Sequence, residues 1–372
     1  LDSLIGAFID KPLPARAGKA TDILRLAAAQ TALLGTPDHA AVSVAVALAG
    51  EFRETAGYAG LINAVARKIA KSGKAAAEKL PDRIDTPGWR WRSWERAYGP
   101  ATARAIAAAN AKEPPLDLTP KRAEDAPSLA ERLGAQILPT GSLRLPRATR
   151  IDALPGFKEG LFWVQDAAAA LPAKLLGDVA GKLVFDLCAA PGGKTLQLAA
   201  AGACVLAVDI AGPRLKLVAE NLQRTALAAE TVKADILEWT PPEKADAILL
   251  DAPCTGTGTI RRHPDILWMK SEDEVATLAR LQARFIDRAV ALLNEGGLLV
   301  YAVCSLQQEE GERQVEEALK RHARLRRVLV SAEEIGGLQE AVTRAGDLRT
   351  LPSMWADSGG MDGFFAARLR LG

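Results

Sequence analysis

Residues 186–195 read DLCAAPGGKT and follow an apolar run, residues 183–186, that is typical of a buried strand. Gly192 and Gly193 permit a tight turn into a helix and let a ligand approach the backbone closely. The next apolar run ends in Asp209, about 20 residues on, where a carboxylate can accept hydrogen bonds from both hydroxyls of a ribose. The stretch therefore predicts a nucleoside-binding turn between a strand and a helix.

Two better-known glycine motifs do not fit this turn. A dinucleotide site more often shows G-x-G-x-x-G, and a phosphate-binding loop shows G-x-x-x-x-G-K-[ST], of which Lys194-Thr195 is only a partial match. Taken alone, the turn leaves several nucleoside cofactors open, as well as purely structural glycines.

Outside this turn, strand-like and helix-like segments alternate. Strands are expected at residues 183–186, 205–209, 247–251 and 298–303, with a weaker one at 230–233, and an amphipathic helix is expected at 274–293. Alternation of this kind predicts an α/β, Rossmann-like fold with a parallel sheet covered by helices on both faces. Ligands of such sheets bind at the carboxyl ends of the strands, so Asp235, just after the weak strand, is expected at the adenine end of a cofactor. The alternative for Asp235 is a helix cap or turn residue.

Two cysteines follow strand ends in this half of the chain. One lies in Asp251-Ala252-Pro253-Cys254 and the other in Val303-Cys304-Ser305. Cytosine C5 is a poor nucleophile, and its methylation requires prior addition of a thiolate at C6, for which cysteine is suited. Asp251 is placed to act as an acid or hydrogen-bond partner at N3 of the base. The alternative is that both cysteines are small buried residues, and this chemistry alone does not rank the two thiols.

These segments carry a resemblance to a known family. Residues 186–194, 251–258 and 260–266, together with Cys304-Ser305 and the closing Asp362-Gly363-Phe364-Phe365, resemble the Sun-type RNA cytosine-5 methyltransferases over residues 160–372. The resemblance implies that Cys304 is the nucleophile and that Cys254 aids product release. It also implies S-adenosylmethionine as cofactor, contacted by Cys188, Ala189, Ala190, Pro191, Gly192, Gly193, Lys194, Asp209, Asp235 and Asp251. The sequence departs from the family at Val303, where threonine is common.

The first part of the chain is helical in pattern. Residues 21–70 resemble the NusB-like RNA-binding domain, and short strand-like pieces follow at 135–138 and 143–145. We therefore expect an all-α NusB-like domain at residues 1–75, a linker and small α/β connector at 76–159, and the Rossmann-like methyltransferase domain at 160–372. Because the chain starts at Leu1 and not at Met, we expect the first domain to be N-terminally incomplete.

Between these parts, residues 89–96 alternate tryptophan with arginine. Such a mixture can stack on bases and hold phosphates. Equally, the tryptophans can anchor the segment to a neighbouring core while the arginines coat it.

Composition narrows the class of partner. Residues 1–150 hold 22 Lys and Arg against 15 Asp and Glu, whereas residues 151–372 hold 25 against 30, which favours a polyanion partner for the first part or else reflects chance clustering. The four cysteines form no Cys-x-x-Cys pair. We therefore expect no metal site and interpret all four as free thiols. The apolar stretch at residues 40–49 is shorter than the roughly 20 residues that span a bilayer.

Without a visible signal sequence, we expect a cytoplasmic monomer that binds RNA, with 16S rRNA as the substrate and no membrane partner. The alternatives are a methyltransferase for tRNA, another RNA or DNA, and an RNA-binding assembly factor whose catalytic half is dormant.

Overall fold

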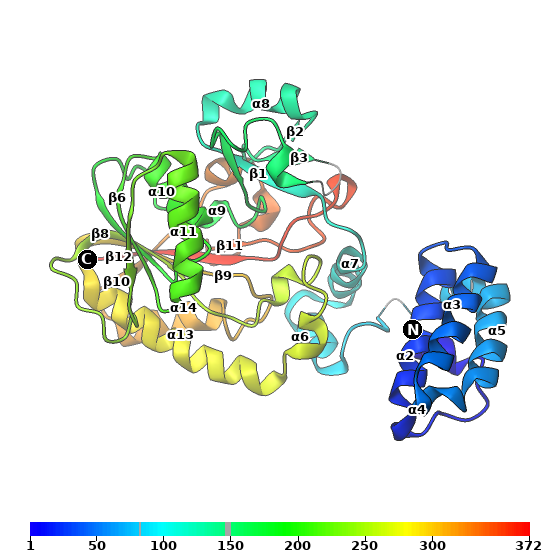
Figure 1. Cartoon of the computed structure of the whole chain (residues 1–372). Helices are drawn as coiled ribbons and strands as arrows, with labels where there is room; N and C mark the ends of the chain where they lie inside the picture. Colours follow the sequence, from blue (N-terminus) through cyan, green and yellow to red (C-terminus); the bar gives the residue numbers. More distant parts are fainter. Residues whose placement is uncertain (82, 146–149) are drawn as a thin grey trace. The chain divides into compact units, whose positions relative to one another are not determined.

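The computed structural model describes residues 1–81, 83–145 and 150–372. The chain forms two compact units, Leu1–Ile84 and Asp85–Gly372, which are described separately (Figure 1). The division expected from the sequence, at residues 75 and 159, stays a prediction, and its connector includes residue 82 and residues 146–149, which lie outside the described residues.

The first unit is all-helical, as predicted. Leu24, Ile62 and Ile69 are fully buried at its centre, where the apolar faces of α2, α3 and α5 meet. The helices are α1 (Asp2–Gly6), α2 (Gly18–Ala28), α3 (Asp38–Glu51), α4 (Arg53–Ala56) and α5 (Ala59–Ala77), with a π-helical turn, Ala29–Leu33, after α2.

The second unit begins with two helices and a small antiparallel sheet. Its sheet has the order β2-β3-β1-β4, and the ion pair between Arg144 and Asp117 (2.7 Å) is buried in it. The sequence predicted β2 and β3 but not β1 and β4. The elements are α6 (Gly88–Tyr98), α7 (Pro100–Asn110), β1 (Leu116–Pro120), α8 (Ala126–Leu133), β2 (Gln136–Ile137), β3 (Leu143–Leu145) and β4 (Phe162–Val164).

The main sheet of the second unit has the order β10-β12-β9-β8-β5-β6-β7, with β11 paired to β12. All five predicted strands are present and parallel, but the prediction of a wholly parallel sheet is wrong at one edge. There β12, the second strand from the edge, runs antiparallel to both β9 and β10, so the sheet is mixed. The strands are β5 (Leu183–Leu187), β6 (Cys204–Asp209), β7 (Glu230–Lys233), β8 (Ala245–Asp251), β9 (Leu293–Val303), β10 (Leu325–Val328), β11 (Leu348–Arg349) and β12 (Phe365–Leu371).

Helices cover both faces of this sheet. α9 (Leu171–Lys174), α10 (Gly193–Ala200) and α11 (Gly212–Thr225) pack on one face, and α13 (Glu272–Leu292) and α14 (Glu312–Arg321) pack on the other (Figure 1). The helix predicted at 274–293 is thus α13, which begins with a capping box between Ser271 and Glu274. A short helix, α12 (Ile266–Met269), precedes it.

The strand order places a crevice beside β5. From β5 the chain runs outward through β6 and β7, then returns to add β8 and β9 on the other side. Ligands of open α/β sheets bind where the order reverses, outside the carboxyl ends of the strands. The loops after β5 and β8 meet at this point. Over the described part of the chain, no helix is long and apolar enough to cross a membrane.

Candidate active site

The loop after β5 has the backbone shape that its glycines predict. Gly192 adopts a φ of +105°, and Cys188, unusually for a residue with a side chain, adopts a φ of +62°. Asp186 accepts a hydrogen bond of 2.5 Å from the Thr195 hydroxyl, while its other oxygen is buried without a partner among the described residues. Burial raises the pKa of Asp186 to about 7.

Asp209, at the end of β6, fixes this loop. Its carboxylate accepts hydrogen bonds from the backbone N–H of Ala190 (3.1 Å) and of Ala211 (2.8 Å). Asp235 is exposed after β7 and accepts from the N–H of Leu237 (2.9 Å), the bond that a turn residue makes. The residues fit an adenosyl cofactor: the helix start at Gly193 suits a carboxylate, and Asp209 retains lone pairs for ribose hydroxyls.

Lys194 joins the loop after β5 to the loop after β8. Its Nζ lies 2.7 Å from Oδ2 of Asp251 and 5.1 Å from the centre of the Phe364 ring. Burial lowers the pKa of Lys194, but the charge and hydrogen bond of Asp251 outweigh burial, so the net pKa is raised and the side chain stays cationic. The site therefore contains a fixed positive charge beside Asp251.

The two predicted thiols meet. The Sγ atoms of Cys254 and Cys304 are 3.4 Å apart, at the ends of the adjacent strands β8 and β9. The pKa of Cys254 is raised well above its usual value by the hydrogen bond with Cys304 and by burial. Burial lowers the pKa values of Lys194 and Arg262, but ion pairing with Asp251 and with Asp362 outweighs burial, so the net pKa of each is raised and both cations persist near the thiols. All four cysteines are free.

Glu310 holds the two cysteine loops together and was not predicted. Its Oε1 accepts from the N–H of Thr255 (2.9 Å) and from the amide of Gln282 (3.1 Å), and its Oε2 accepts from the hydroxyls of Thr255 and Ser305. The side chain is fully buried, and burial raises its pKa despite these bonds. It lies in the polar run of residues 307–310, whose composition is typical of an exposed loop, so the sequence does not indicate that Glu310 is buried.

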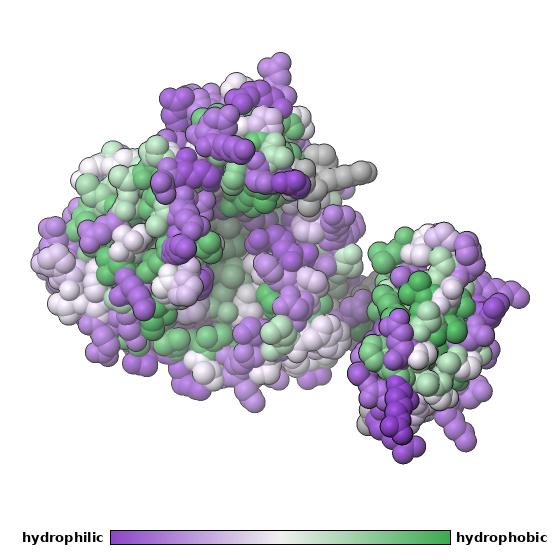
Figure 2. Space-filling model, viewed as in Figure 1, coloured by the Kyte–Doolittle hydropathy of each residue, from purple (hydrophilic) through white to green (hydrophobic). Residues whose placement is uncertain are grey.

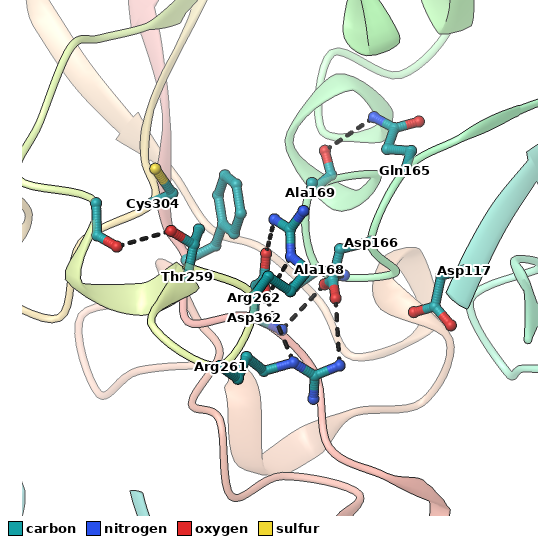
Figure 3. Close-up of polar contacts among 12 residues, drawn as sticks. Asp117, Gln165, Asp166, Ala168, Ala169, Thr259, Arg261, Arg262, Cys304 and Asp362 are labelled. Atoms are coloured by element: carbon teal, nitrogen blue, oxygen red, sulfur yellow. Dashed lines mark hydrogen bonds and ion pairs between the residues drawn. The ribbon is translucent and has the colours of Figure 1, made fainter. Parts of the chain in front are cut away.

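A second unpredicted group surrounds Arg262. Both its Nε and its Nη2 bind the fully buried Asp362, and Asp166 accepts from the N–H of Asp362 (3.0 Å). Burial raises the pKa of Asp362 to about 7, against the opposing effect of Arg262. Figure 3 shows Arg262 between Cys304 and this carboxylate pair, with Arg261 directed to the side of Asp166. The pair thus holds a second cation near the thiols.

The backbone of the Cys254 loop also approaches the C-terminal segment closely. A Cβ atom on Gly258 would lie 1.8 Å from the carbonyl oxygen of Gly363. Gly258 N–H donates to the carbonyl of Cys304 (3.0 Å), and Gly363 N–H donates to that of Gly258 (2.8 Å). Only glycine fits here.

The tryptophan and arginine segment is α6, and most of its aromatic surface is internal. Trp94 and Trp91 are buried against Ile260 and Leu306, and Arg90 donates to the carbonyl of Leu267 (2.8 Å). The anchoring interpretation is therefore confirmed for Trp91 and Trp94, whereas Arg90 is buried with them and does not coat the segment as that interpretation expected. The face of the second unit is hollowed between α11 and the region of α6 (Figure 2).

Comparisons with known proteins agree with this geometry. The family model described as 16S rRNA methyltransferase RsmB/F matches residues 173–370, and the NusB family model matches residues 1–71. Two relatives are named ribosomal RNA small subunit methyltransferase B. The relative from Erwinia tasmaniensis is 34% identical, and the match covers 99% of this chain and 86% of the relative. The relative from Serratia proteamaculans is 40% identical, and the match covers 75% of this chain and 69% of the relative.

Solved structures show the same fold. A methyltransferase homolog from Pyrococcus horikoshii has a TM-score of 0.61 at 26% identity, covering 75% of this chain and 93% of its own. NSun6 from the same organism has a TM-score of 0.66 at 18% identity, and the match covers 78% of this chain and 99% of NSun6. With its NusB domain and its methyltransferase domain, the chain belongs to the RsmB/F family and is an S-adenosylmethionine-dependent RNA methyltransferase.

Proposed function

We propose that this enzyme methylates C5 of a cytosine in 16S rRNA, through a covalent bond between Cys304 and C6 of the base. The observation that carries the proposal is the pair of thiols, 3.4 Å apart, at strand ends beside the cofactor loop. A single buried cysteine would be unremarkable, whereas two thiols in contact at this edge of the sheet suit a reaction that makes and then breaks a carbon–sulfur bond.

Cys304 acts as a thiolate in the first step. Its sulfur adds to C6, and the electron pair of the C5–C6 double bond moves toward C5, which becomes nucleophilic. Lys194 and Arg262 favour the thiolate, since the charge on Cys304 and the charges on these cations stabilise each other. S-adenosylmethionine, when bound, supplies the electrophilic methyl group.

Asp251 orients the base. Its Oδ2 is bound by Lys194, and no other partner of its carboxylate is found among the described residues, so Oδ1 can accept from the amino group at C4 of cytosine. The cation of Lys194 lies beside it and can supply a hydrogen bond or proton toward N3 as charge develops on the ring.

Cys254 serves the second half of the reaction. Because its pKa is raised, it remains a thiol at neutral pH and can donate a hydrogen bond to the departing sulfur of Cys304. The C5 proton leaves to solvent, the double bond re-forms, and Cys304 departs as a thiolate. Release of the methylated RNA thus depends on Cys254.

The other parts of the chain present the RNA. The NusB-like domain, proposed as residues 1–75, and the connector, proposed as residues 76–159, carry the excess of Lys and Arg over Asp and Glu that a polyanion requires. The relatives are named for the small-subunit ribosomal RNA, which supports 16S rRNA over other substrates. We propose a cytoplasmic monomer.

The test is methyl incorporation from labelled S-adenosylmethionine into 16S rRNA, tRNA and duplex DNA at equal cytosine concentration. The proposal expects labelling of 16S rRNA at a single 5-methylcytosine and background labelling of the other two. Equal labelling of DNA, or a methyl group at any atom other than C5, would contradict it.

A further inference from the structure

A small pocket lies between α6 and the loop that follows Cys304. It has a volume of about 200 Å3, and its main lining residues are Trp89, Arg92, Ser93 and Arg96 of α6, together with Gln307, Glu309 and Glu272. Sites for drug-sized ligands have roughly 300–1,000 Å3, so this cavity suits a single base-sized group. We name this cavity the α6 pocket. The proposed mechanism assigns it no function.

Direct hydrogen bonds connect the α6 pocket to the thiol loop. Gln307 donates from its amide to the hydroxyl of Ser93 (3.0 Å), and Tyr98 donates to the carbonyl of Leu306 (2.7 Å). Gln307 is the third residue after Cys304, so their Cα atoms are at most about 11 Å apart. A group bound in the pocket is therefore held close to the reacting base.

One face of α6 offers the contacts that a nucleotide requires. Trp89, Arg92 and Arg96 recur at three- and four-residue steps, which places them on the same side of the helix. Arg92 and Arg96 are exposed, and neither has a hydrogen bond or ion pair within the described residues. Trp89 is half-buried and lines the pocket, and the guanidinium of Arg90 lies over its ring at 4.6 Å, so part of its aromatic surface is accessible for stacking.

The opposite wall offers acceptors for a base edge. Gln307 is 2% exposed, and its Oε1 is buried without a partner among the described residues. Glu272 and Glu309 add carboxylates, of which Glu309 is paired with Arg313 (3.0 Å). Carboxylate and amide oxygens accept from the amino groups of bases and repel phosphate, so the phosphate belongs on the arginine side.

We infer that the α6 pocket binds a nucleotide that flanks the target cytosine in single-stranded RNA. Its base stacks on Trp89 and presents amino or ring N–H groups to Gln307 and the carboxylates, while Arg92 and Arg96 bind its phosphates. This inference rests on the proposed function, because it takes RNA as the substrate. It assigns to this pocket the choice of sequence context around the target.

The test compares the full-length double variant Arg92→Ala/Arg96→Ala with a matched control, Arg104→Ala, an exposed arginine on the adjacent helix α7 that does not line the pocket. For methylation of RNA, the double variant is expected to raise KM about tenfold or more with kcat nearly unchanged, and Arg104→Ala is expected to change neither. Loss of two phosphate contacts also lowers the slope of log affinity against log salt by about 1.4. An unchanged KM and salt slope would overturn the inference.

A second pair of variants separates stacking from folding. Trp89→Ala is expected to weaken binding of a fluorescent single-stranded RNA about tenfold, whereas Trp89→Phe, which keeps an aromatic face, recovers most of it. Equal affinity of both variants and the wild type would contradict the inference. This binding assay needs no methyl transfer, so it remains decisive even if the wild-type enzyme fails to methylate 16S rRNA and the proposed function fails.

Discussion

The loops after β8 and β9 carry the same functional group at the same edge of the sheet, in different surroundings. Cys254 has a raised pKa, because it shares a hydrogen bond with Cys304 and is buried, with Glu310 adding a like charge. Cys304 interacts with the cations Lys194 and Arg262. In the proposed mechanism, these different neighbouring charges, and not strand position, distinguish the thiol that attacks from the thiol that assists.

Cys304→Ala tests this comparison with the largest expected effect. Without the attacking sulfur, C5 of cytosine stays unreactive, and single-turnover methyl transfer is expected to fall by at least about 10³-fold. Cys204→Ala, which removes an exposed thiol at the start of β6, is the matched control and is expected to keep full activity. Activity retained by Cys304→Ala and lost by Cys254→Ala would reverse the two roles.

Cys254→Ala is expected to separate attack from release. Cys304 can still form its bond to C6, but the departing sulfur loses its hydrogen bond, so the covalent protein–RNA adduct accumulates. Denaturing electrophoresis with labelled RNA measures this adduct directly. A variant that neither turns over nor forms any adduct would show that Cys254 acts before bond formation.

Substitutions of Glu310 test whether both cysteine loops depend on the hydrogen bonds to its carboxylate. Glu310→Ala leaves the Thr255 N–H and the Gln282 amide without their acceptor and is expected to destabilise the fold by about 3 kcal/mol in urea unfolding. Glu310→Gln is expected to cost less than half as much, since its amide nitrogen can donate to the hydroxyls of Thr255 and Ser305.

The wild type and Glu310→Gln are also expected to differ in how their stability depends on pH. Burial raises the pKa of Glu310 above its ordinary value of 4.5, so the folded protein binds this proton more tightly than the unfolded chain. The protonated Glu310 therefore contributes to the free energy of unfolding below pH 4.5, and this contribution is lost as the pH rises through the pKa of Glu310 in the folded protein. Glu310→Gln removes this loss, and its stability relative to the wild type is therefore expected to improve with rising pH. A constant difference from pH 4 to pH 8 would argue against it.

Val303→Thr is expected to have the smallest effect. Val303 is fully buried in the apolar core opposite Phe365, so a hydroxyl there would lack an obvious partner. A loss of roughly 1–2 kcal/mol in unfolding free energy is expected, with the methylation rate within about threefold of the wild type. A large gain in rate would show that the family's usual threonine contributes to catalysis.

The sequence predicts the parts of the fold that have strong local patterns. Four of the five parallel strands are apolar runs, β7 being the exception, and the helix at residues 272–292 has a clear amphipathic period. Strand β12 was missed because Arg368 and Arg370 interrupt its apolar pattern. Such strands form because partners far apart in the sequence pair with them.

The candidate site divides in the same way. Glycines and cysteines are visible from the sequence, because their turns and their chemistry depend on few neighbours. Glu310 and Asp362 were not assigned to the site, because an acidic residue is buried only where distant donors meet it. Here those donors are Thr255 and Gln282 for Glu310, and Arg262 for Asp362.

The position of β12 has a consequence for how activity arises during folding. β12 lies inside the sheet, between β9 and β10, although both precede it in the chain. Until β12 inserts, β10 lacks its neighbour, and Gly363 and Asp362 cannot contact Gly258 and Arg262. Pairing over such long sequence separations is slow. On refolding, catalytic competence is therefore expected to return with the slowest structural phase, after most secondary structure has formed.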